Sequence, residues 1–490
     1  MKLAILGGGG VRMPLFVRAV LASRPGTFGE ICLFEPAAGR RDTICRLAME
    51  IAAALGHPGV VTVTDDAAEA FTGADYVFSA IRVGGDRGRV IDEQVALQRG
   101  IVGQETTGPG GCAMALRTIP VVLSYCDLLS RCAPDAVLIN FTNPAGLITQ
   151  AIAAQGRVRA VGVCDTPGGT VERMAEFLGA GRDSAGGEAA AADGAATGGH
   201  LARSGGATAS YGGLNHLGWV CSLQVGGQER IGELLARFEE LQGFDHRFAA
   251  FDPAEVRRVG AIPTEYVYYF YDPRRYLDGV TRAGASRGQD VLRLNTELLD
   301  NLAKAYAEGG VDAAWSAYDT LLGVRRDTYM QTDMQGASGQ DQARARRAAR
   351  PAAGLAGATV GGYEGLALRV IDGLSGHGAG ELIVNTRNGG RGAPLSLDFL
   401  DPDDIVEVPA LVTPDGVSPR AVTGLPRSGR ALIMQVKEYE RGVVEAAMSG
   451  DAGLAAVALA QHPLVPGITA ARELIDEYRA EHGEHLAYLR

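Results

Sequence analysis

The first 175 residues alternate short apolar runs with amphipathic segments, and this alternation limits the folds that the chain can adopt. Six of the runs read as buried strands, at residues 2–6, 30–36, 61–65, 75–81, 136–142 and 159–164. Segments with helical apolar spacing, such as 11–23 and 40–56, separate them. Strands that alternate with helices form a parallel sheet covered on both faces. The sequence therefore predicts an α/β fold whose residues 1–175 form a Rossmann-like, doubly wound domain, similar to that of lactate and malate dehydrogenases.

The remainder of the chain, residues 176–490, has a mixed and mostly helical pattern. Amphipathic segments such as 230–242 and 431–450 predict helices. We expect this C-terminal α+β domain to carry the substrate site and the oligomer contacts. Residues 180–209 are too rich in Gly, Ala and Ser to bury a packed face, and we expect a flexible insertion there. A second insertion is expected at 335–358, although its Arg and Ala content also allows a partial helix.

Charge and composition narrow the classes of partner that the protein is expected to bind. The net charge of -11 and the pI near 5.3 argue against a nucleic acid or an anionic membrane surface, and favour a small ligand. The first apolar run is too short for a secretory signal, and no uninterrupted run approaches the roughly 20 residues of a membrane-spanning helix. We therefore expect a cytoplasmic protein whose seven cysteines are reduced.

A glycine run follows the first predicted strand, and an acid ends the second. Gly7, Gly8, Gly9 and Gly10 lie between a strand and a helix, where glycines let the backbone approach a pyrophosphate. Glu35 stands where a Rossmann acid binds the ribose hydroxyls. An acid at this position would repel a 2′-phosphate. The pattern predicts an NAD site, although a glycine turn can also be a plain connection and Glu35 a solvated acid.

Six further motifs occur in a fixed order along the chain, at residues 80–111, 140–146, 162–167, 213–219, 262–271 and 286–292. Among them are "NFTNPAG", "GVCDTP", "GLNHLGW" and "SRGQDVL". Together with the glycine turn they resemble glycoside hydrolase family 4, whose members are NAD- and metal-dependent glycosidases of the 6-phospho-glucosidase type. The resemblance extends over almost the whole chain outside the two expected insertions.

The resemblance implies hydrolysis of O-glycosidic bonds, most simply of α- or β-linked 6-phospho-glucosides, by a redox route that replaces the usual pair of carboxylates. NAD takes hydride from C3 of the sugar, a base removes the acidified C2 proton, and the C1 leaving group is eliminated. Water then adds and the hydride returns. A divalent metal, usually Mn²⁺ in this family, binds the C2 and C3 oxygens.

The family motifs assign roles to particular residues. Cys164 and His216 match the two metal ligands, although a lone cysteine at a strand end is more often a core residue. Tyr266 matches the base that takes the C2 proton and needs a nearby cation, the metal or Arg287, to favour its phenolate. Asp165 matches a general acid for the leaving group.

The family motifs also predict sugar-binding and cofactor-binding residues. Arg82 is expected at the cofactor. Amide and charged side chains that hydrogen-bond sugar oxygens are expected at Asn143, Arg89, Glu105, Asn215 and Arg287. For each of them the alternative is a polar residue at a sheet edge or on the surface.

Two departures from the family pattern leave the substrate open. Family members place Ser and Thr after the glycine turn, where this chain has Val11 and Arg12. Arg12 could bind a sugar phosphate instead, or could indicate an α-glycosidase that acts on unphosphorylated sugars. The pair of Cys164 and Asp165 leans towards the α subgroup, but one residue does not fix the anomer.

Other functions remain as alternatives. An NAD-dependent 2-hydroxy-acid dehydrogenase would share the N-terminal fold, but it would need a His–Asp pair for which we find no motif. A non-catalytic sugar-nucleotide sensor would be expected to lose Cys164, His216 or Tyr266, and all three are present. By analogy with the family we expect a homodimer or a homotetramer.

Overall fold

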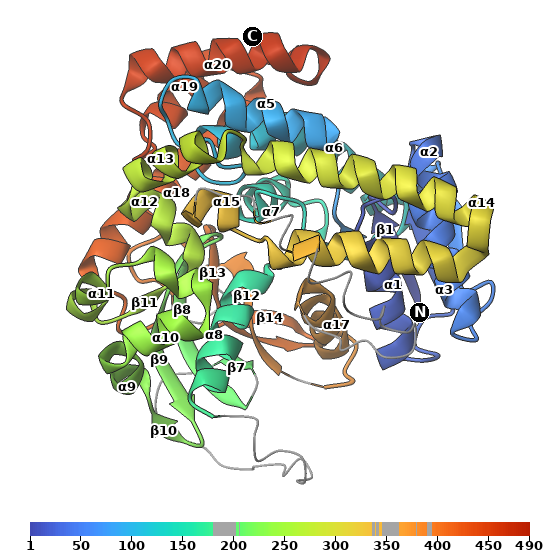
Figure 1. Cartoon of the computed structure of the whole chain (residues 1–490), viewed down its shortest axis with the longest axis horizontal. Helices are drawn as coiled ribbons and strands as arrows, with labels where there is room; N and C mark the ends of the chain where they lie inside the picture. The colour runs from blue at the N-terminus through green and yellow to red at the C-terminus, as the bar shows by residue number, and fades with distance from the viewer. Residues whose placement is uncertain are drawn as a thin grey trace. The chain divides into compact units, whose positions relative to one another are not determined.

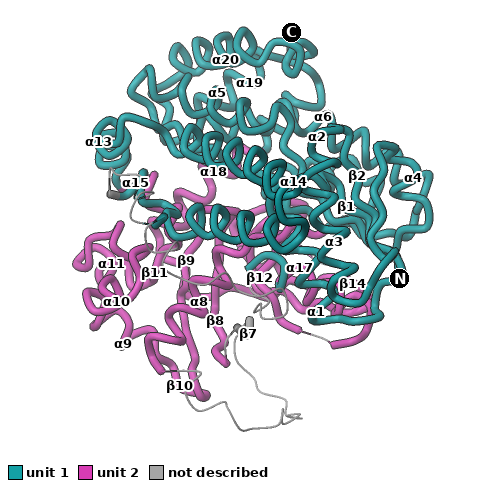
Figure 2. The backbone as a smooth tube through the Cα atoms, turned by 45° about the vertical axis from the view of Figure 1, so that its right-hand side comes forward, with its two compact units in different colours: residues 1–160, 272–365, 441–490 teal, residues 161–271, 366–440 magenta. Residues whose placement is uncertain are grey.

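The computed structural model describes residues 1–179, 202–204, 206–335, 339, 343–344, 362–378, 380–389 and 394–490. They form two compact units, each assembled from separate stretches of sequence (Figure 2). Unit 1 comprises Met1–Ala160, Asp272–Gly365 and Arg441–Arg490, and unit 2 comprises Val161–Tyr271 and Leu366–Glu440. From the sequence we expect two consecutive domains that meet near residue 175, and this boundary stays a prediction.

Unit 1 contains a parallel sheet in the order β5-β4-β1-β2-β3. Its strands are β1 (Lys2–Leu6), β2 (Glu30–Phe34), β3 (Val61–Thr64), β4 (Tyr76–Ser79) and β5 (Val137–Asn140). Nearly every residue of β1, β2, β4 and β5 is buried, as expected of strands covered on both faces. The strand order reverses at β1, where doubly wound sheets bind ligands beyond the carboxyl ends of their strands. The Rossmann-like prediction is confirmed.

Helices of unit 1 bury apolar faces on this sheet and on one another. Phe16 of α1 stacks on Phe78 of β4, with ring centroids 4.4 Å apart. The long helix α14, yellow in Figure 1, begins with a capping box between Ser286 and Gln289 and is interrupted at Gly310. The helices wholly within unit 1 are α1 (Met13–Ser23), α2 (Ala38–Arg40), α3 (Arg46–Ala54), α4 (Ala67–Phe71), α5 (Gly85–Leu97), α6 (Pro109–Cys132), α7 (Ala145–Gln155), α13 (Pro273–Ala283), α14 (Arg287–Asp327), α15 (Gln331–Gln335), α19 (Ala452–Ala460) and α20 (Ile468–His482), with a π-turn η1 (Arg41–Cys45) and a 3₁₀ turn η4 (Gly483–Leu486).

Helix α6 alone, within the described part of the chain, has the length and hydropathy to cross a membrane, with a mean hydropathy of 1.5 over its most apolar window. That window is 61% buried inside the protein. Arg117, near its middle, is fully buried and forms an ion pair with Asp92 of α5 at 2.5 Å. A charge pair buried against a neighbouring helix is a feature of a core helix, and α6 therefore belongs to the core of unit 1.

Unit 2 is built on an antiparallel sheet in the order β10-β9-β8-β13-β12-β6, to which β11, β14 and β7 add at β9, β13 and β8. The strands are β6 (Arg159–Gly162), β7 (Ala202–Ser204), β8 (Ala207–Leu214), β9 (Leu217–Val225), β10 (Gln228–Glu229), β11 (Ile262–Pro263), β12 (Gly380–Arg387), β13 (Ile405–Thr413) and β14 (Gly416–Pro419). Strand β6 begins in unit 1 and ends in unit 2. The mixed α+β prediction is confirmed, with more strand than its mostly helical pattern suggested.

Short helices accompany the sheet of unit 2. They are α8 (Asp165–Phe177), α9 (Ile231–Ala236), α10 (Phe238–Phe244), α11 (Pro253–Val259) and α12 (Tyr268–Tyr271), with 3₁₀ turns η2 (His246–Ala250) and η3 (Glu265–Val267). Two longer helices, α17 (Gly362–Leu374) and α18 (Arg427–Ser449), contribute residues to both units.

Part of the first expected insertion is strand. Residues 202–204 form β7, and β8 begins at Ala207. Ala207 and Ala209 are fully buried, because a strand that packs closely against its neighbours accommodates small side chains. Residues 180–201 and most of the second expected insertion lie outside the described residues.

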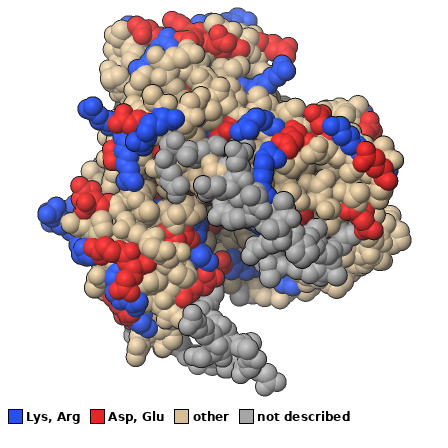
Figure 3. Space-filling model, in the orientation of Figure 1, with Lys and Arg blue, Asp and Glu red and all other residues tan. Residues whose placement is uncertain are grey.

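Charged side chains of both signs lie interspersed on the face drawn in Figure 3. Elsewhere in the described residues, charges also pair along helices, for example Arg237 with Glu233 and Glu240. The described residues on this face therefore carry no broad field of one sign.

Candidate functional site

The glycine turn of unit 1 packs so closely that side chains are excluded from it. A Cβ on Gly7 would lie 2.8 Å from the Ala80 carbonyl oxygen, and one on Gly8 would lie 2.6 Å from the Leu33 Cβ. Gly7 also adopts a left-handed backbone conformation, with φ of 87°. The turn thus follows β1 with bare backbone and leads into the N-terminus of α1, as a dinucleotide-binding turn requires.

Glu35 contacts this turn directly. It follows β2, is 8% exposed, and accepts hydrogen bonds from the backbone N–H groups of Gly9 and Ala37, each at 3.0 Å. A Cβ on Gly9 would lie 2.6 Å from Glu35 Oε2. The acid and the turn therefore form one arrangement, and a side chain at Gly9 would push the acid away. These residues fit a dinucleotide whose ribose hydroxyls meet Glu35.

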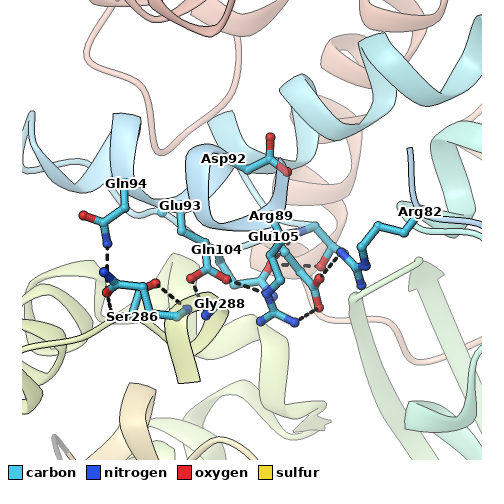
Figure 4. A network of polar contacts seen from close by, with 12 residues as sticks. Arg82, Arg89, Asp92, Glu93, Gln94, Gln104, Glu105, Ser286 and Gly288 are labelled. Atoms are coloured by element: carbon cyan, nitrogen blue, oxygen red, sulfur yellow. Dashed lines mark hydrogen bonds and ion pairs between the residues drawn. The ribbon is translucent and has the colours of Figure 1, made fainter. Parts of the chain in front are cut away.

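A partly buried chain of charges lies beyond β4 in unit 1 (Figure 4). Glu105 bridges Arg82, at 2.8 Å, and Arg89, at 3.0 Å. Arg89 also donates to Glu93 at 2.8 Å, one helical turn further along α5. The structure thus brings together Arg82, Arg89 and Glu105, which the sequence predicted separately. Burial alone would raise the pKa of Glu105, but Arg89 and Arg82 outweigh it and hold the value at about 2.

Glu93 was not singled out from the sequence, and it connects this chain of charges to α14. Its Oε2 accepts the backbone N–H of Gly288 at 2.6 Å, in the first turn of the helix that begins at Arg287. A carboxylate is stabilised at a helix N-terminus. The spacing of Arg89 and Glu93, four residues apart on one helix, was the available signal.

Arg287 belongs to a group of arginines in unit 1. Arg325 donates to Asn295 Oδ1 at 3.2 Å. Burial lowers the pKa of Arg325 to about 10; Asp86 opposes this effect, and the positive charges of Arg287, Arg89 and Arg12 add to it. Arg12 forms an ion pair with Glu364 at 3.4 Å and keeps 38% of its side chain exposed. The positive charges of Arg287, Arg89 and Arg12 thus act on Arg325 together, and a bound anion would relieve this repulsion.

Asn143 follows β5 in a loop held by its neighbours. Asn140 donates to Thr149 Oγ1 at 3.1 Å and accepts the backbone N–H of Thr142 at 3.1 Å. The Thr142 hydroxyl lies 2.8 Å from that of Ser79, at the end of β4. The partly exposed Asn143 therefore sits at the carboxyl edge of the sheet, on a loop with a fixed path.

The predicted metal ligands and the predicted base all lie in unit 2. Cys164 is 5% exposed and precedes α8, while His216 is 6% exposed in the two-residue turn between β8 and β9. His216 has a left-handed φ of 63°, which is rare outside glycine. Its ring stacks on Tyr266, with centroids 3.8 Å apart and planes within 3° of parallel. The structure thus joins residues from two motifs 50 positions apart in the sequence.

Two carboxylates accompany this group. Asp165, partly exposed, is the first residue of α8. Glu407 of β13 was not singled out from the sequence; it is 1% exposed. Its carboxylate accepts hydrogen bonds from the Tyr211 hydroxyl at 2.8 Å and from the amides of Asn215 at 3.1 Å and Asn385 at 3.0 Å. Burial raises the pKa of Glu407 to about 7, although these three donors favour the ionised form.

Cys164 and His216 would supply only part of a metal's ligands, and substrate oxygens would supply others. Within the described residues, no three His, Cys, Asp or Glu side chains form a cage by themselves. A thiolate and an imidazole leave positions for sugar oxygens and water, the open arrangement of a catalytic site. Burial raises the pKa of the Cys164 thiol well above its usual range, and Glu407 and Asp165 raise it further. A bound cation would favour the thiolate at this position.

The parallel sheet and its glycine turn have the geometry of a dinucleotide-binding domain, and unit 2 adds a buried thiol and an imidazole stacked on a phenol. Two family models match the chain, the family 4 glycosyl hydrolase model at residues 2–180 and the model of its C-terminal domain at residues 211–465. The chain belongs to the family 4 glycosyl hydrolases and is a glycosidase. The resemblance inferred from the motifs is confirmed.

Individual relatives span the whole chain. The probable 6-phospho-beta-glucosidase of Bacillus subtilis (strain 168) is 27% identical over 99% of this chain and 97% of its own length. The 6-phospho-alpha-glucosidase of Leptotrichia buccalis is 24% identical over 97% and 96%. A 6-phospho-beta glucosidase of Thermotoga maritima, solved with manganese, NAD⁺ and glucose-6-phosphate, has the same fold, with a TM-score of 0.74, 23% identity and 98% coverage of both chains.

Proposed function

We propose that the protein hydrolyses O-glycosidic bonds of 6-phospho-glucosides with NAD and a divalent metal such as Mn²⁺. The stacking of His216 on Tyr266 at 3.8 Å is the observation that carries this proposal, because it sets a predicted metal ligand against the predicted base. Relatives named for both α and β substrates match over the whole chain, so the anomer is left to experiment.

The proposed roles of the residues of unit 2 follow from their chemistry. When bound, NAD supplies a hydride acceptor for C3 and the metal a Lewis acid for the neighbouring oxygens. The Tyr266 phenolate accepts the C2 proton, and its burial keeps bulk water from competing for that proton. Asp165, at the partly exposed start of α8, gives a proton to the leaving-group oxygen. Cys164 and His216 hold the metal.

The proposed roles in unit 1 are binding and orientation. Glu35 bonds the ribose and the glycine turn accommodates the pyrophosphate. Arg82 lies against the cofactor. Sugar hydroxyls are proposed to be bound by Arg89, Glu105, Asn143, Arg287 and Asn215. One N–H of the Asn215 amide donates to Glu407, which leaves its oxygen as an acceptor and its second N–H as a donor.

The 6-phosphate is proposed to bind at Arg12 and Arg325. The positive charges of Arg287, Arg89 and Arg12 depress the pKa of the partly buried Arg325, and a phosphate would relieve this repulsion. Arg12 stands where family members carry a hydroxyl residue, and guanidinium is a strong phosphate partner.

Three further expectations accompany this function. We propose an N-terminal cofactor domain that ends near residue 175 and a C-terminal domain after it. A cytoplasmic location would keep the Cys164 thiol reduced for a metal. A homodimer or a homotetramer is proposed by analogy with the family.

The proposal is tested with nitrophenyl α- and β-glucosides, each with and without a 6-phosphate, in the presence of NAD and Mn²⁺. We expect turnover of a phosphorylated substrate that chelator and NAD removal both abolish. Arg325→Met should raise KM for it about tenfold or more, because a hydrogen bond to a charged group contributes about 1.5–3 kcal/mol. The exposed neighbour Arg326, changed to Met, is the matched control. Activity that survives removal of both metal and NAD would overturn the proposal.

A further inference from the structure

A row of residues crosses the sheet of unit 2 just before the two predicted metal ligands. Asn385 of β12 is paired with Glu407 of β13 on one side and with Gly162 of β6 on the other. On the far side of β13, Glu407 is paired with Gly213 of β8. Cys164 follows Gly162 by two residues and His216 follows Gly213 by three. Glu407 therefore occupies a central strand between the two chain segments that carry the ligands.

The hydrogen bonds of Glu407 hold the segment that carries His216. Asn215, its neighbour in the turn, donates to Glu407 Oε1, and Tyr211, near the end of β8, donates to Oε2. A left-handed conformation at a residue other than glycine costs of order 1–3 kcal/mol and persists only when the surroundings impose it. His216 has this conformation. The bond from Asn215 to Glu407 is one of the contacts that impose it.

The packing around Tyr211 allows its hydroxyl to reach Glu407. Tyr211 is fully buried, and a Cβ on Gly218 would lie 2.0 Å from its hydroxyl oxygen. Its ring therefore needs a glycine opposite it to reach Glu407. On the other side of β13, Asn385 is also fully buried and donates to the same carboxylate oxygen as Asn215. All three donors are neutral and both carboxylate oxygens act as acceptors, so these bonds favour the ionised form against the burial that raises its pKa.

We infer that Glu407 is a positioning residue for the metal centre, holding the His216 turn in place through Asn215 and, through Asn385, the strand that leads to Cys164. This inference rests on the proposed metal site. The second link is the register of the sheet, because Asn385 donates to Glu407 and is paired with Gly162, two residues before Cys164. Residues that orient the ligands of a metal commonly contribute 10- to 100-fold to its affinity.

The test is Mn²⁺ binding to the purified, NAD-loaded protein, measured by electron paramagnetic resonance of free and bound Mn²⁺. Glu407→Gln should weaken Mn²⁺ binding about 10- to 100-fold and change the spectrum of the bound ion, while the Kd for NAD⁺ stays unchanged. Glu381→Gln is the matched control, because Glu381 lies on β12 in the same unit and pairs with Arg420 at 3.0 Å. Glu407→Asp, which keeps the charge, should recover part of the affinity.

Two results distinguish the ways in which the inference can fail. If Cys164→Ser binds Mn²⁺ as tightly as the parent, the proposed metal site itself is wrong. If Cys164→Ser loses Mn²⁺ but a folded Glu407→Gln binds it with the parent affinity and spectrum, the metal site stands and the role of Glu407 is overturned. Circular dichroism and the melting temperature establish which variants are folded, and if Glu407→Gln does not fold, Glu407→Asp decides by the same comparison.

Discussion

The two units bury carboxylates in different ways. In unit 1, Glu105 lies between two arginines, and opposite charges hold its pKa at about 2. In unit 2, Glu407 receives three neutral donors, and burial leaves its pKa at about 7. Two neighbouring arginines keep a carboxylate ionised and neutralise its charge. Neutral donors do not neutralise the charge, so an ionised carboxylate can still attract a cation. The difference agrees with the proposed roles, in which unit 1 binds anionic groups and unit 2 holds a metal and moves protons.

The variant with the largest expected effect distinguishes the proposed chemistry of unit 2 from cofactor binding at unit 1. Tyr266→Phe should lower kcat by about 10²- to 10⁴-fold, the usual contribution of a general base, while NAD⁺ binding at unit 1 stays unchanged. Steady-state kinetics and fluorescence titration of NAD⁺ measure the two quantities. Tyr271→Phe, at an exposed tyrosine of the same segment, is the control and should be near parent activity. Equal losses in the two variants would remove Tyr266 from the chemistry.

The second effect tests the charge pairs of unit 1. Glu105→Gln removes one of the carboxylates that pair with buried Arg89 and should reduce the free energy of unfolding by about 3 kcal/mol at pH 7. The lowered pKa of Glu105 gives a contribution that is present above its usual value of 4.5 and is lost as the pH falls through about 2. Urea denaturation at pH 7 and below pH 4 should therefore show the gap between parent and variant closing in acid. A gap independent of pH would contradict the role of the pairs.

The smallest effect concerns the neutral donors of unit 2. Gly218→Ala would place a Cβ against the Tyr211 hydroxyl and should cost about 1–3 kcal/mol of stability, because buried Tyr211 has no room to yield. It should also weaken Mn²⁺ binding, in the same direction as Glu407→Gln. Gly168→Ala is the control: nothing lies within 4 Å of its Cβ position in α8, and Ala there should be neutral or stabilising. A stability unchanged in Gly218→Ala would show that Tyr211 is free to move.

Much of unit 1 could be predicted from the sequence because its signals are local. The five strands of its parallel sheet appear as apolar runs, and the glycine turn and Glu35 occupy set positions at strand ends. In unit 2, the family motifs indicated Cys164, His216 and Tyr266. Only the structure shows the parallel stacking of His216 on Tyr266.

The role of Glu407 could not be predicted because nothing near it in the sequence indicates it. Its partner Asn215 is 192 residues away, and the contact depends on β13 pairing between β8 and β12. Glu93 is an intermediate case, since its bond to Arg89 follows helical spacing but its bond to Gly288 spans 195 residues. The start of β8, residues 207–209, was expected to be part of a flexible insertion because its composition suggested a loop, and pairing with β9 outweighs that local preference.

The row formed by Gly162, Asn385, Glu407 and Gly213 also has an evolutionary consequence. Side chains alternate between the faces of a strand, so inserting or deleting one residue within β13 ahead of Glu407 would turn this carboxylate to the opposite face. Loops at the strand ends tolerate changes of length far better. Descendants of this chain can therefore vary the substrate by lengthening loops, whereas a change of length in β13 would separate the carboxylate from the ligand segments in a single step.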